Sequence, residues 1–311
     1  MRSTPQGEHR PVLLAEVLAA LDPQPGQVVV DGTVGFGGHA AELLRRVGPT
    51  GKLIGLDLDA GNLPRAREQL EAVGFPFSLH HANFAGLPQV LAAEGLTAAD
   101  AVLADVGVSS MQIDDADRGF SFVRDGPLDM RMDRSRGKTA ADLLATLPAA
   151  ELAQAFRDYG DEPQADAIAK AIVAARPTGR LERTRQLADL IAAAAPVRIK
   201  KPGPGVPTPR QQRLRPAARV FQALRILVNR ELANLAALLR VLPMVLNPGG
   251  RAAVISFHSG EDRLVKQAFR DGLRSGVYAA VSDEAVRATW TERQANPRSR
   301  SAKLRWAHKT G

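Results

Sequence analysis

The chain has 311 residues, 45% of them hydrophobic, which is enough for one large globular domain or two of ordinary size. It contains no cysteine, so disulfides, thiolate metal sites and thiol nucleophiles are excluded. No apolar run is long enough to span a membrane, and the first residues lack the apolar segment of a secretion signal. We therefore expect a globular cytoplasmic protein without membrane association, and no motif predicts a metal site.

Much of the positive charge, which totals +8 net, lies in two acid-free stretches. Nine Lys or Arg fall within residues 198–230 and six within residues 293–309. Such stretches are often solvated linkers or tails, but in a basic chain they also mark polyanion sites. Composition alone leaves both interpretations open.

The first part of the chain alternates apolar, β-rich segments with amphipathic ones. Strands are predicted at residues 27–31, 52–57, 75–81 and 100–107, with helices beginning near Gly38, Pro64 and Leu87. Nearly continuous apolar strands separated by helices are typical of a parallel sheet covered on both faces. We expect an α/β domain that binds its ligand at the carboxyl ends of the strands.

The middle of the chain is different in character. Residues 111–137 are polar and turn-rich, which indicates a structured loop. Helical spacing of apolar residues then recurs at 139–147, 149–160, 162–176 and 183–196. Residues 200–216 contain five prolines and predict an exposed, semi-stiff basic linker.

The α/β pattern resumes after the Pro-rich segment. It predicts one long helix at 217–246, a turn at 247–250, a strand at 251–257 and an edge strand at 301–309. This order favours one discontinuous α/β domain, residues 1–112 and 216–311, interrupted by an inserted helical domain, residues 113–215.

The glycine-rich stretch DGTVGFGGH, residues 31–39, predicts a ligand loop between a strand and a helix. It fits a dinucleotide fingerprint if Ala40 stands for the third glycine, and the absence of GK[ST] excludes a Walker phosphate loop. Asp31 would repel a pyrophosphate but would suit the sulfonium and ammonium groups of S-adenosylmethionine. Asp57, after the second strand, can bind the ribose of either cofactor. These residues favour S-adenosylmethionine over a nicotinamide cofactor but exclude neither.

Seven motifs run in order along nearly the whole chain: HRPVLLAEVL, DGTVGFGGH, LADVGVSSMQIDDADRGFSF, DGPLDMRM, RVFQALRILVN, PGGRAAVISFHSGEDR and NPRSRSAKLR. They resemble the bacterial RsmH (MraW) family of 16S ribosomal RNA (cytosine-N4)-methyltransferases. The resemblance implies a class I methyltransferase fold, Rossmann-like and doubly wound, with an inserted all-α domain. It also implies S-adenosylmethionine as methyl donor, S-adenosylhomocysteine as product, and a decoding-centre cytidine of 16S rRNA in the small ribosomal subunit as acceptor.

The same resemblance implies a set of cofactor-binding residues. Its motifs correspond here to Gly37, Gly38, His39, Asp57, Phe84, Asp105 and Gln112. From the residues alone, His39 and Asp57 also fit helix caps, and Phe84 also fits the core. The chain departs from the family pattern at HSGEDR, at SSMQID, in the short 270–292 region and in the Pro-rich sequence before PAAR. These departures concern RNA contacts and the C-terminal edge more than the cofactor.

The chemistry of the acceptor is restricted by composition. Methylation at cytosine C5 requires a cysteine nucleophile, which the chain lacks. Methylation of an exocyclic amine requires positioning and electrostatics without a covalent intermediate. Asp105 is the candidate catalytic residue, with cofactor binding as its first expected role and contact with the amine as its second; the usual [DNS]PP[YFW] motif is absent.

Candidate substrate-binding residues come from the later motifs and the basic stretch. They are Asn229, His258 and Ser259 for the base, and Arg213, Arg215 and Arg219 for the RNA backbone, with Phe120 and Phe122 also facing RNA. Ser259 with Asp262 equally resembles a helix cap, His258 could pack beside it, and Asn229 could bond only a neighbouring loop.

Other functions remain open on the sequence. They include a different S-adenosylmethionine-dependent amine methyltransferase acting on DNA, tRNA or protein, a nicotinamide dehydrogenase, and a non-catalytic ribosome assembly factor. The oligomeric state, a homodimer included, the proton acceptor, and the choice between naked RNA and assembled subunit are also undetermined.

Overall fold

The computed structural model describes residues 11–201, 203 and 206–311. The chain divides into two compact units, which we call the sheet unit (Met1–Gly107 with Leu232–Gly311) and the helical unit (Val108–Glu231). The sequence placed these boundaries at 112/113 and 215/216. Among the described residues, no helix is both long and apolar enough to cross a membrane.

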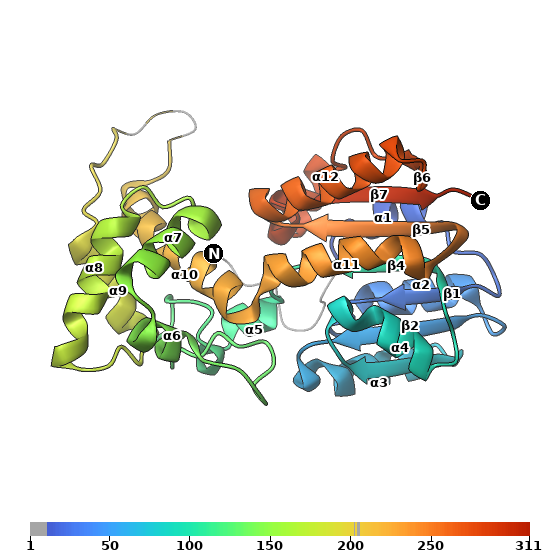
Figure 1. Ribbon diagram of the computed structural model, residues 1–311, viewed down its shortest axis with the longest axis horizontal. Coiled ribbons are helices and arrows are strands. Elements are labelled where there is room, and N and C mark those ends of the chain that lie inside the picture. The colour runs from blue at the N-terminus through green and yellow to red at the C-terminus, as the bar shows by residue number, and fades with distance from the viewer. Residues whose placement is uncertain (1–10, 202, 204–205) are drawn as a thin grey trace. The chain divides into compact units, whose positions relative to one another are not determined.

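The sheet unit is built on seven strands in the order β3-β2-β1-β4-β5-β7-β6 (Figure 1). Neighbours among β1 to β5 run parallel, whereas β7 is antiparallel to both β5 and β6. The strands are β1 (Val28–Asp31), β2 (Lys52–Asp57), β3 (Phe77–His81), β4 (Ala99–Asp105), β5 (Leu246–Ser256), β6 (Tyr278–Val281) and β7 (Lys303–Lys309). The parallel sheet predicted from the apolar segments is therefore present.

Alternate residues of the central strands face opposite sides of the sheet, and both sides are buried. Val29 and Leu53 belong to one hydrophobic cluster, whereas Val30 and Ile54 belong to another. The first cluster includes residues of α1 (Leu14–Leu21), α2 (Gly38–Val47) and α3 (Leu63–Glu71). The second includes residues of α4 (Leu87–Ala93), α11 (Glu231–Val245) and α12 (Ser259–Arg274). A short helix, α13 (Trp290–Ala295), precedes β7.

The C-terminal side of the sheet differs from the sequence prediction. The segment predicted as an edge strand, β7, lies inside the sheet because the short strand β6 pairs with its outer side. The predicted turn at 247–250 lies within β5, where the pairing with β4 jumps from Leu246 to Arg251. The four residues NPGG are thus accommodated as an irregularity of the strand.

The helical unit contains the short helix α5 (Ser110–Asp114) and five helices that share one core: α6 (Ala140–Thr146), α7 (Ala149–Gly160), α8 (Ala165–Ala175), α9 (Thr184–Ala194) and α10 (Pro209–Asn229). Phe156, Ile168, Leu187 and Val220 are fully buried in that core. They come from four different helices, so the insertion has a hydrophobic core of its own.

Two predictions about the segment 200–246 are wrong. Helix α10 begins at Pro209, inside the predicted linker, because Oγ1 of Thr208 accepts from the N–H of Gln211 and Oε1 of Gln211 accepts from the N–H of Thr208. The predicted single helix is two, because Arg230 takes a left-handed conformation with φ 52° that ends α10.

Candidate active site

A glycine turn joins β1 to α2 at the carboxyl edge of the sheet. Gly35 and Gly37 have φ of 52° and 88°, conformations that other residues adopt only with strain. A Cβ on Gly37 would lie 3.4 Å from Cα of Ala66, so the turn also packs closely on α3. The N-terminus of α2 is therefore held beside β1 and β4, where the strand order reverses and open α/β sheets bind ligands.

Asp31 and Asp105 end the two strands at this reversal, and Thr33 connects them. The backbone N–H of Thr33 donates to Oδ1 of Asp31 over 3.0 Å, and the backbone N–H of Asp105 donates to Oγ1 of Thr33 over 2.7 Å. Oδ1 of Asp105 is buried and has no hydrogen-bond partner among the described residues. A buried acceptor of this kind is uncommon in proteins and indicates a place for a ligand.

The two carboxyl groups have strongly raised pKa values. Burial raises the pKa of Asp31 to about 7, and the charge of Asp57 adds to the effect. Burial raises the pKa of Asp105 to about 8, with further contributions from the charges of Asp31 and Glu261. A cation bound beside them would favour their ionised forms, so the pair is suited to a positively charged ligand.

His39, in the first turn of α2, is buried between the N-terminal segment and Asp105. Its Nε2 lies 2.8 Å from the carbonyl oxygen of Val12, and its Nδ1 lies 3.9 Å from Oδ2 of Asp105. Because a carbonyl can only accept, Nε2 carries a hydrogen and donates it to the carbonyl oxygen of Val12. His39 thus ties Val12 to the ligand edge and does not cap α2, whose N-cap is Gly37.

Asp57 ends β2 and supports the glycine turn directly. Its Oδ2 accepts from the N–H of Gly35 at 2.8 Å and from Nδ2 of Asn62 at 3.2 Å, and its Oδ1 accepts from the N–H of Asp59 at 2.7 Å. Burial raises the pKa of Asp57, although each of these three hydrogen bonds acts to lower it. Because a carboxylate has about four acceptor positions and three are used, roughly one remains for a ribose hydroxyl.

Phe84 begins a short 3-10 turn after β3 and lies against the glycine turn. A Cβ on Gly32 would be 3.1 Å from Cβ of Phe84, so a larger residue there would push Phe84 aside by a few tenths of an ångström. Phe84 is partly buried against the sheet's second cluster. Phe84 thus follows β3 at the carboxyl edge of the sheet and also contributes to the core.

The remaining candidates of the sheet unit lie after β5. His258 caps α12, accepting from the N–H groups of Gly260 and Glu261 at 3.2 and 3.4 Å, and Ser259 is the first residue of that helix. Glu261 is 1% exposed and accepts from the N–H of Phe257 at 2.8 Å. The motif therefore does contain a helix cap, but the capping residue is His258 and not Ser259, as the sequence had suggested.

The candidates in the helical unit are engaged within that unit. Gln112 forms a capping box with Ser109 at the start of α5. Asn229 donates to the carbonyl of Met130 and accepts from the N–H of Met132, at 2.8 and 2.7 Å, so it holds a neighbouring loop.

Other candidates of the helical unit divide between core and surface. Phe120 is 8% exposed and belongs to the core of the unit, whereas Phe122 is partly buried and packs edge-on against Phe221 with ring centroids 4.9 Å apart. Arg213, Arg215 and Arg219 all lie on α10.

Sequence reasoning missed three residues that organise the sheet edge: Thr33, Asn62 and Glu261. Thr33 joins Asp31 to Asp105, Asn62 binds Asp57, and Glu261 closes the turn after β5. Only Thr33 had a signal, since it stands two residues after an acidic strand end where a hydroxyl can bond the next strand.

Residues 6–310 match the model of the MraW methylase family. The chain belongs to this family. The Ribosomal RNA small subunit methyltransferase H of Syntrophotalea carbinolica is 47% identical over 96% of each chain. Its namesake from Geobacter sp. strain M21 is 45% identical over 97% of this chain and 98% of its own. A solved rRNA methylase structure from Streptococcus thermophilus aligns over 98% of this chain and 100% of its own, with 11% identity and a TM-score of 0.43.

Membership in the MraW methylase family confirms the resemblance found in the sequence, and the strand order with an antiparallel β7 confirms the class I methyltransferase fold. S-adenosylmethionine is the methyl donor of this MraW methylase. The residues fit it: a partnerless buried carboxylate oxygen on Asp105 and raised pKa values at Asp31 and Asp105 suit a sulfonium and an ammonium group.

Proposed function

We propose that the protein transfers the methyl group of S-adenosylmethionine to the exocyclic N4 of a cytidine of 16S rRNA in the small ribosomal subunit. Family membership and the names of the relatives support methylation of small-subunit rRNA. The observation that carries the amine target is the free buried Oδ1 of Asp105 at the strand reversal. It is an acceptor at the end of β4 for which the described residues supply no donor, and an amine N–H can satisfy it.

Asp105 has two consecutive roles in this proposal. When bound, S-adenosylmethionine supplies a methyl group on a positively charged sulfur. That charge favours the carboxylate of Asp105, which accepts an N4–H and turns the nitrogen lone pair toward the methyl carbon. The bound cofactor would supply the methyl group and keep the electron pair of its C–S bond as it leaves as S-adenosylhomocysteine. Asp105 would then accept the proton that the methylated N4 loses.

The other candidates take positioning roles. Gly37, Gly38 and His39 would hold the cofactor at the N-terminus of α2, with Asp57 at the ribose and Phe84 and Gln112 as further contacts. His258 would shape the turn after β5 through its capping bonds, and Asn229 would fix the loop at residues 130–132. Neither side chain needs to touch the base for this.

Nucleoside mass spectrometry tests the proposal directly. Small subunits and, separately, naked 16S rRNA are incubated with the protein and isotopically labelled S-adenosylmethionine, then digested. We expect labelled N4-methylcytidine, which Asp105→Asn abolishes while the variant remains folded. Label in another nucleoside, in DNA, in tRNA or in protein would assign a different amine methyltransferase. Subunit binding without any transfer would indicate an assembly factor.

A further inference from the structure

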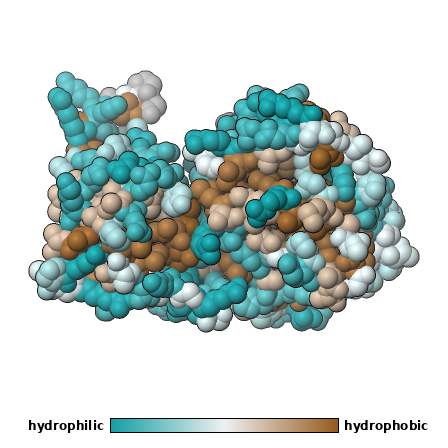
Figure 2. Space-filling model, in the orientation of Figure 1, coloured by the Kyte–Doolittle hydropathy of each residue, from teal (hydrophilic) through white to brown (hydrophobic). Residues whose placement is uncertain are grey.

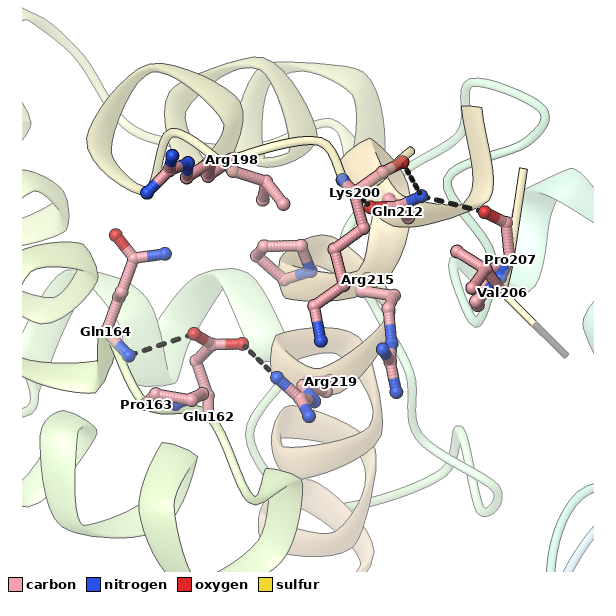
Figure 3. A pocket seen from close by; sticks show the side chains of 12 residues that line it. Glu162, Pro163, Gln164, Arg198, Lys200, Val206, Pro207, Gln212, Arg215 and Arg219 are labelled. Atoms are coloured by element: carbon pink, nitrogen blue, oxygen red, sulfur yellow. Dashed lines mark hydrogen bonds and ion pairs between the residues drawn. The ribbon is translucent and has the colours of Figure 1, made fainter. Parts of the chain in front are cut away.

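The helical unit contains a pocket of about 300 Å³ that no step above uses (Figure 3). Its walls are α10, the residues before α8, and the segment that precedes α10. A site of this size falls at the lower end of the range for small-molecule sites. Around this segment the surface of the helical unit is largely hydrophilic (Figure 2).

The walls of the pocket are fastened by Gln212, which is 5% exposed. Its Oε1 accepts from the backbone N–H of Lys200 at 2.8 Å, and its Nε2 donates to the carbonyls of Lys200 and Pro207 at 3.2 and 2.8 Å (Figure 3). Both sides of the segment before α10 are thus bound to one buried side chain. The pocket is a built feature of the unit and not a gap between loose loops.

Four cations line the pocket: Arg198, Lys200, Arg215 and Arg219. Within the part of the chain that the structure describes, the first three have no carboxylate at ion-pair distance, and Arg219 lies 3.5 Å from Glu162. Three of four positive charges are therefore uncompensated, which favours an anion such as phosphate. Proline and valine side chains complete the lining, and such apolar surfaces can pack against a ribose or a base.

Glu162 adds a buried acceptor to the wall of this basic pocket. It is 2% exposed, and its Oε1 accepts from the N–H of Gln164 at 2.9 Å. Its Oε2 has an ion pair with Arg219 but no hydrogen-bond partner. Figure 3 shows this oxygen on the same side of the pocket as Arg219. A buried acceptor among cations calls for a ligand that carries N–H donors as well as negative charge.

We propose that this pocket holds one unpaired nucleotide of the RNA substrate. Its phosphates lie on Arg198, Lys200 and Arg215, and an N–H of its base donates to Glu162. An acidic peptide would satisfy the cations, but its carboxylates would face Glu162. The proposal rests on the proposed function only in taking RNA as the substrate. It assigns the pocket a holding role apart from the methyl-transfer edge, because all its lining residues belong to the helical unit.

Fluorescence anisotropy tests the phosphate contacts. It measures the binding of a labelled single-stranded RNA to the full-length protein at several salt concentrations. Arg215→Gln should weaken binding and lower the salt slope by about 0.7. Arg213→Gln is the matched control, since Arg213 is exposed on the same helix but does not line the pocket. A larger loss for Arg215→Gln supports the pocket. If both variants lose the same RNA affinity, or neither loses any, α10 is only a diffuse basic surface and the proposal fails.

The base contact is tested with Glu162→Gln and two strands, the RNA and an abasic ribose-phosphate strand of the same length. Removal of a negative charge should tighten binding of the abasic strand, whereas loss of the charged acceptor should weaken binding of the RNA. Tighter binding of both strands would mean a phosphate site alone. If poly-glutamate displaces the labelled strand but unlabelled RNA does not, the pocket binds an acidic protein partner. Either result overturns the proposal that the pocket holds a nucleotide.

Methylation assays separate this inference from the proposed function. If wild-type protein forms no N4-methylcytidine but Arg215→Gln still binds RNA more weakly than Arg213→Gln, the pocket stands and the proposed target fails. If Arg215→Gln methylates small subunits with an unchanged KM, the function stands and the pocket proposal fails.

Discussion

Thr33 and Asp105 are joined by a 2.7 Å hydrogen bond from the backbone N–H of Asp105 to Oγ1 of Thr33. The same threonine donates its backbone N–H to Asp31, so one residue ties together the ends of two neighbouring strands that each carry a carboxyl group. Both carboxyl groups have raised pKa values, and bringing them together costs free energy unless a cation joins them. Thr33 therefore maintains an arrangement whose electrostatics are completed by a ligand.

Replacing Thr33 by valine should damage the cofactor site while nearly preserving side-chain shape. The N–H of Asp105 would lose its acceptor, which costs about 1 to 3 kcal/mol for a buried group. We expect lower thermal stability and weaker S-adenosylmethionine binding by calorimetry. Thr33→Ser retains the hydroxyl and is the control. Equal affinity of the valine and serine variants for S-adenosylmethionine would show that the hydroxyl of Thr33 does not support the cofactor site.

The raised pKa values of Asp31 and Asp105 predict how stability depends on pH without cofactor. Between the ordinary pKa of 3.8 and the folded values of about 7 and 8, the folded protein binds protons that the unfolded chain has released. Stability contributed by these groups is therefore present at low pH and is lost as pH rises toward 8. Thermal denaturation from pH 5 to 8.5 should show this fall, and Asp105→Asn should make it shallower.

Cofactor affinity should depend on pH in the opposite sense. A sulfonium or ammonium group binds the ionised carboxyl groups better, so S-adenosylmethionine should bind more tightly as pH rises through 7 and 8. Calorimetric titrations at pH 6 and 8.5 measure the difference. A pH-independent affinity in the wild type would show that neither group titrates with the ligand.

Gly37→Ala should cost both stability and cofactor binding. Gly37 has φ 88° and its missing Cβ would lie 3.4 Å from Ala66, so alanine introduces backbone strain of about 1 kcal/mol or more in a turn that faces the ligand. Gly74→Ala is a matched control, with φ 78° and no atom within 4 Å of the added Cβ. Both variants should melt earlier, but only Gly37→Ala should bind the cofactor more weakly.

The ligand edge was predictable because carboxyl ends of parallel strands meet at one edge. Asp31, Asp57 and Asp105 each end an apolar segment, and in the structure each ends a strand of the same sheet. What each carboxylate binds was not predictable. The partners of Asp57 come from the glycine turn and from Asn62, which depend on how two loops fold together.

The errors in the fold have equally local causes. Five prolines obscured the start of α10, although Thr208, Pro209 and Gln211 form a cap signal. Arg230 ends that helix with a left-handed backbone that usually selects glycine or asparagine, so no composition signal marked the break. Strand β6 has four residues, too few for a clear period, and without it β7 looked like an edge.

Asp262 should be a main stabilising contact of the C-terminal strand. Its carboxylate lies 2.9 Å from Nζ of Lys303 and 2.7 Å from Nε of Arg305, and Arg305 is 4% exposed. These partners lower the pKa of Asp262, so its contribution is present at neutral pH and is lost as pH falls below about 4. Asp262→Asn would leave Arg305 buried without a counter-charge, at a cost of about 3 kcal/mol.

Urea denaturation at pH 7 measures that cost. Asp271→Asn is the control, because Asp271 pairs with Arg274 on the same helix with both side chains more than half exposed, and should cost less than about 1 kcal/mol. The difference between the two variants should shrink as the pH is lowered below about 4, because the contribution of Asp262 is lost as its carboxylate becomes protonated. A small effect of Asp262→Asn at pH 7, or a difference that does not change with pH, would mean that water replaces the carboxylate at Arg305.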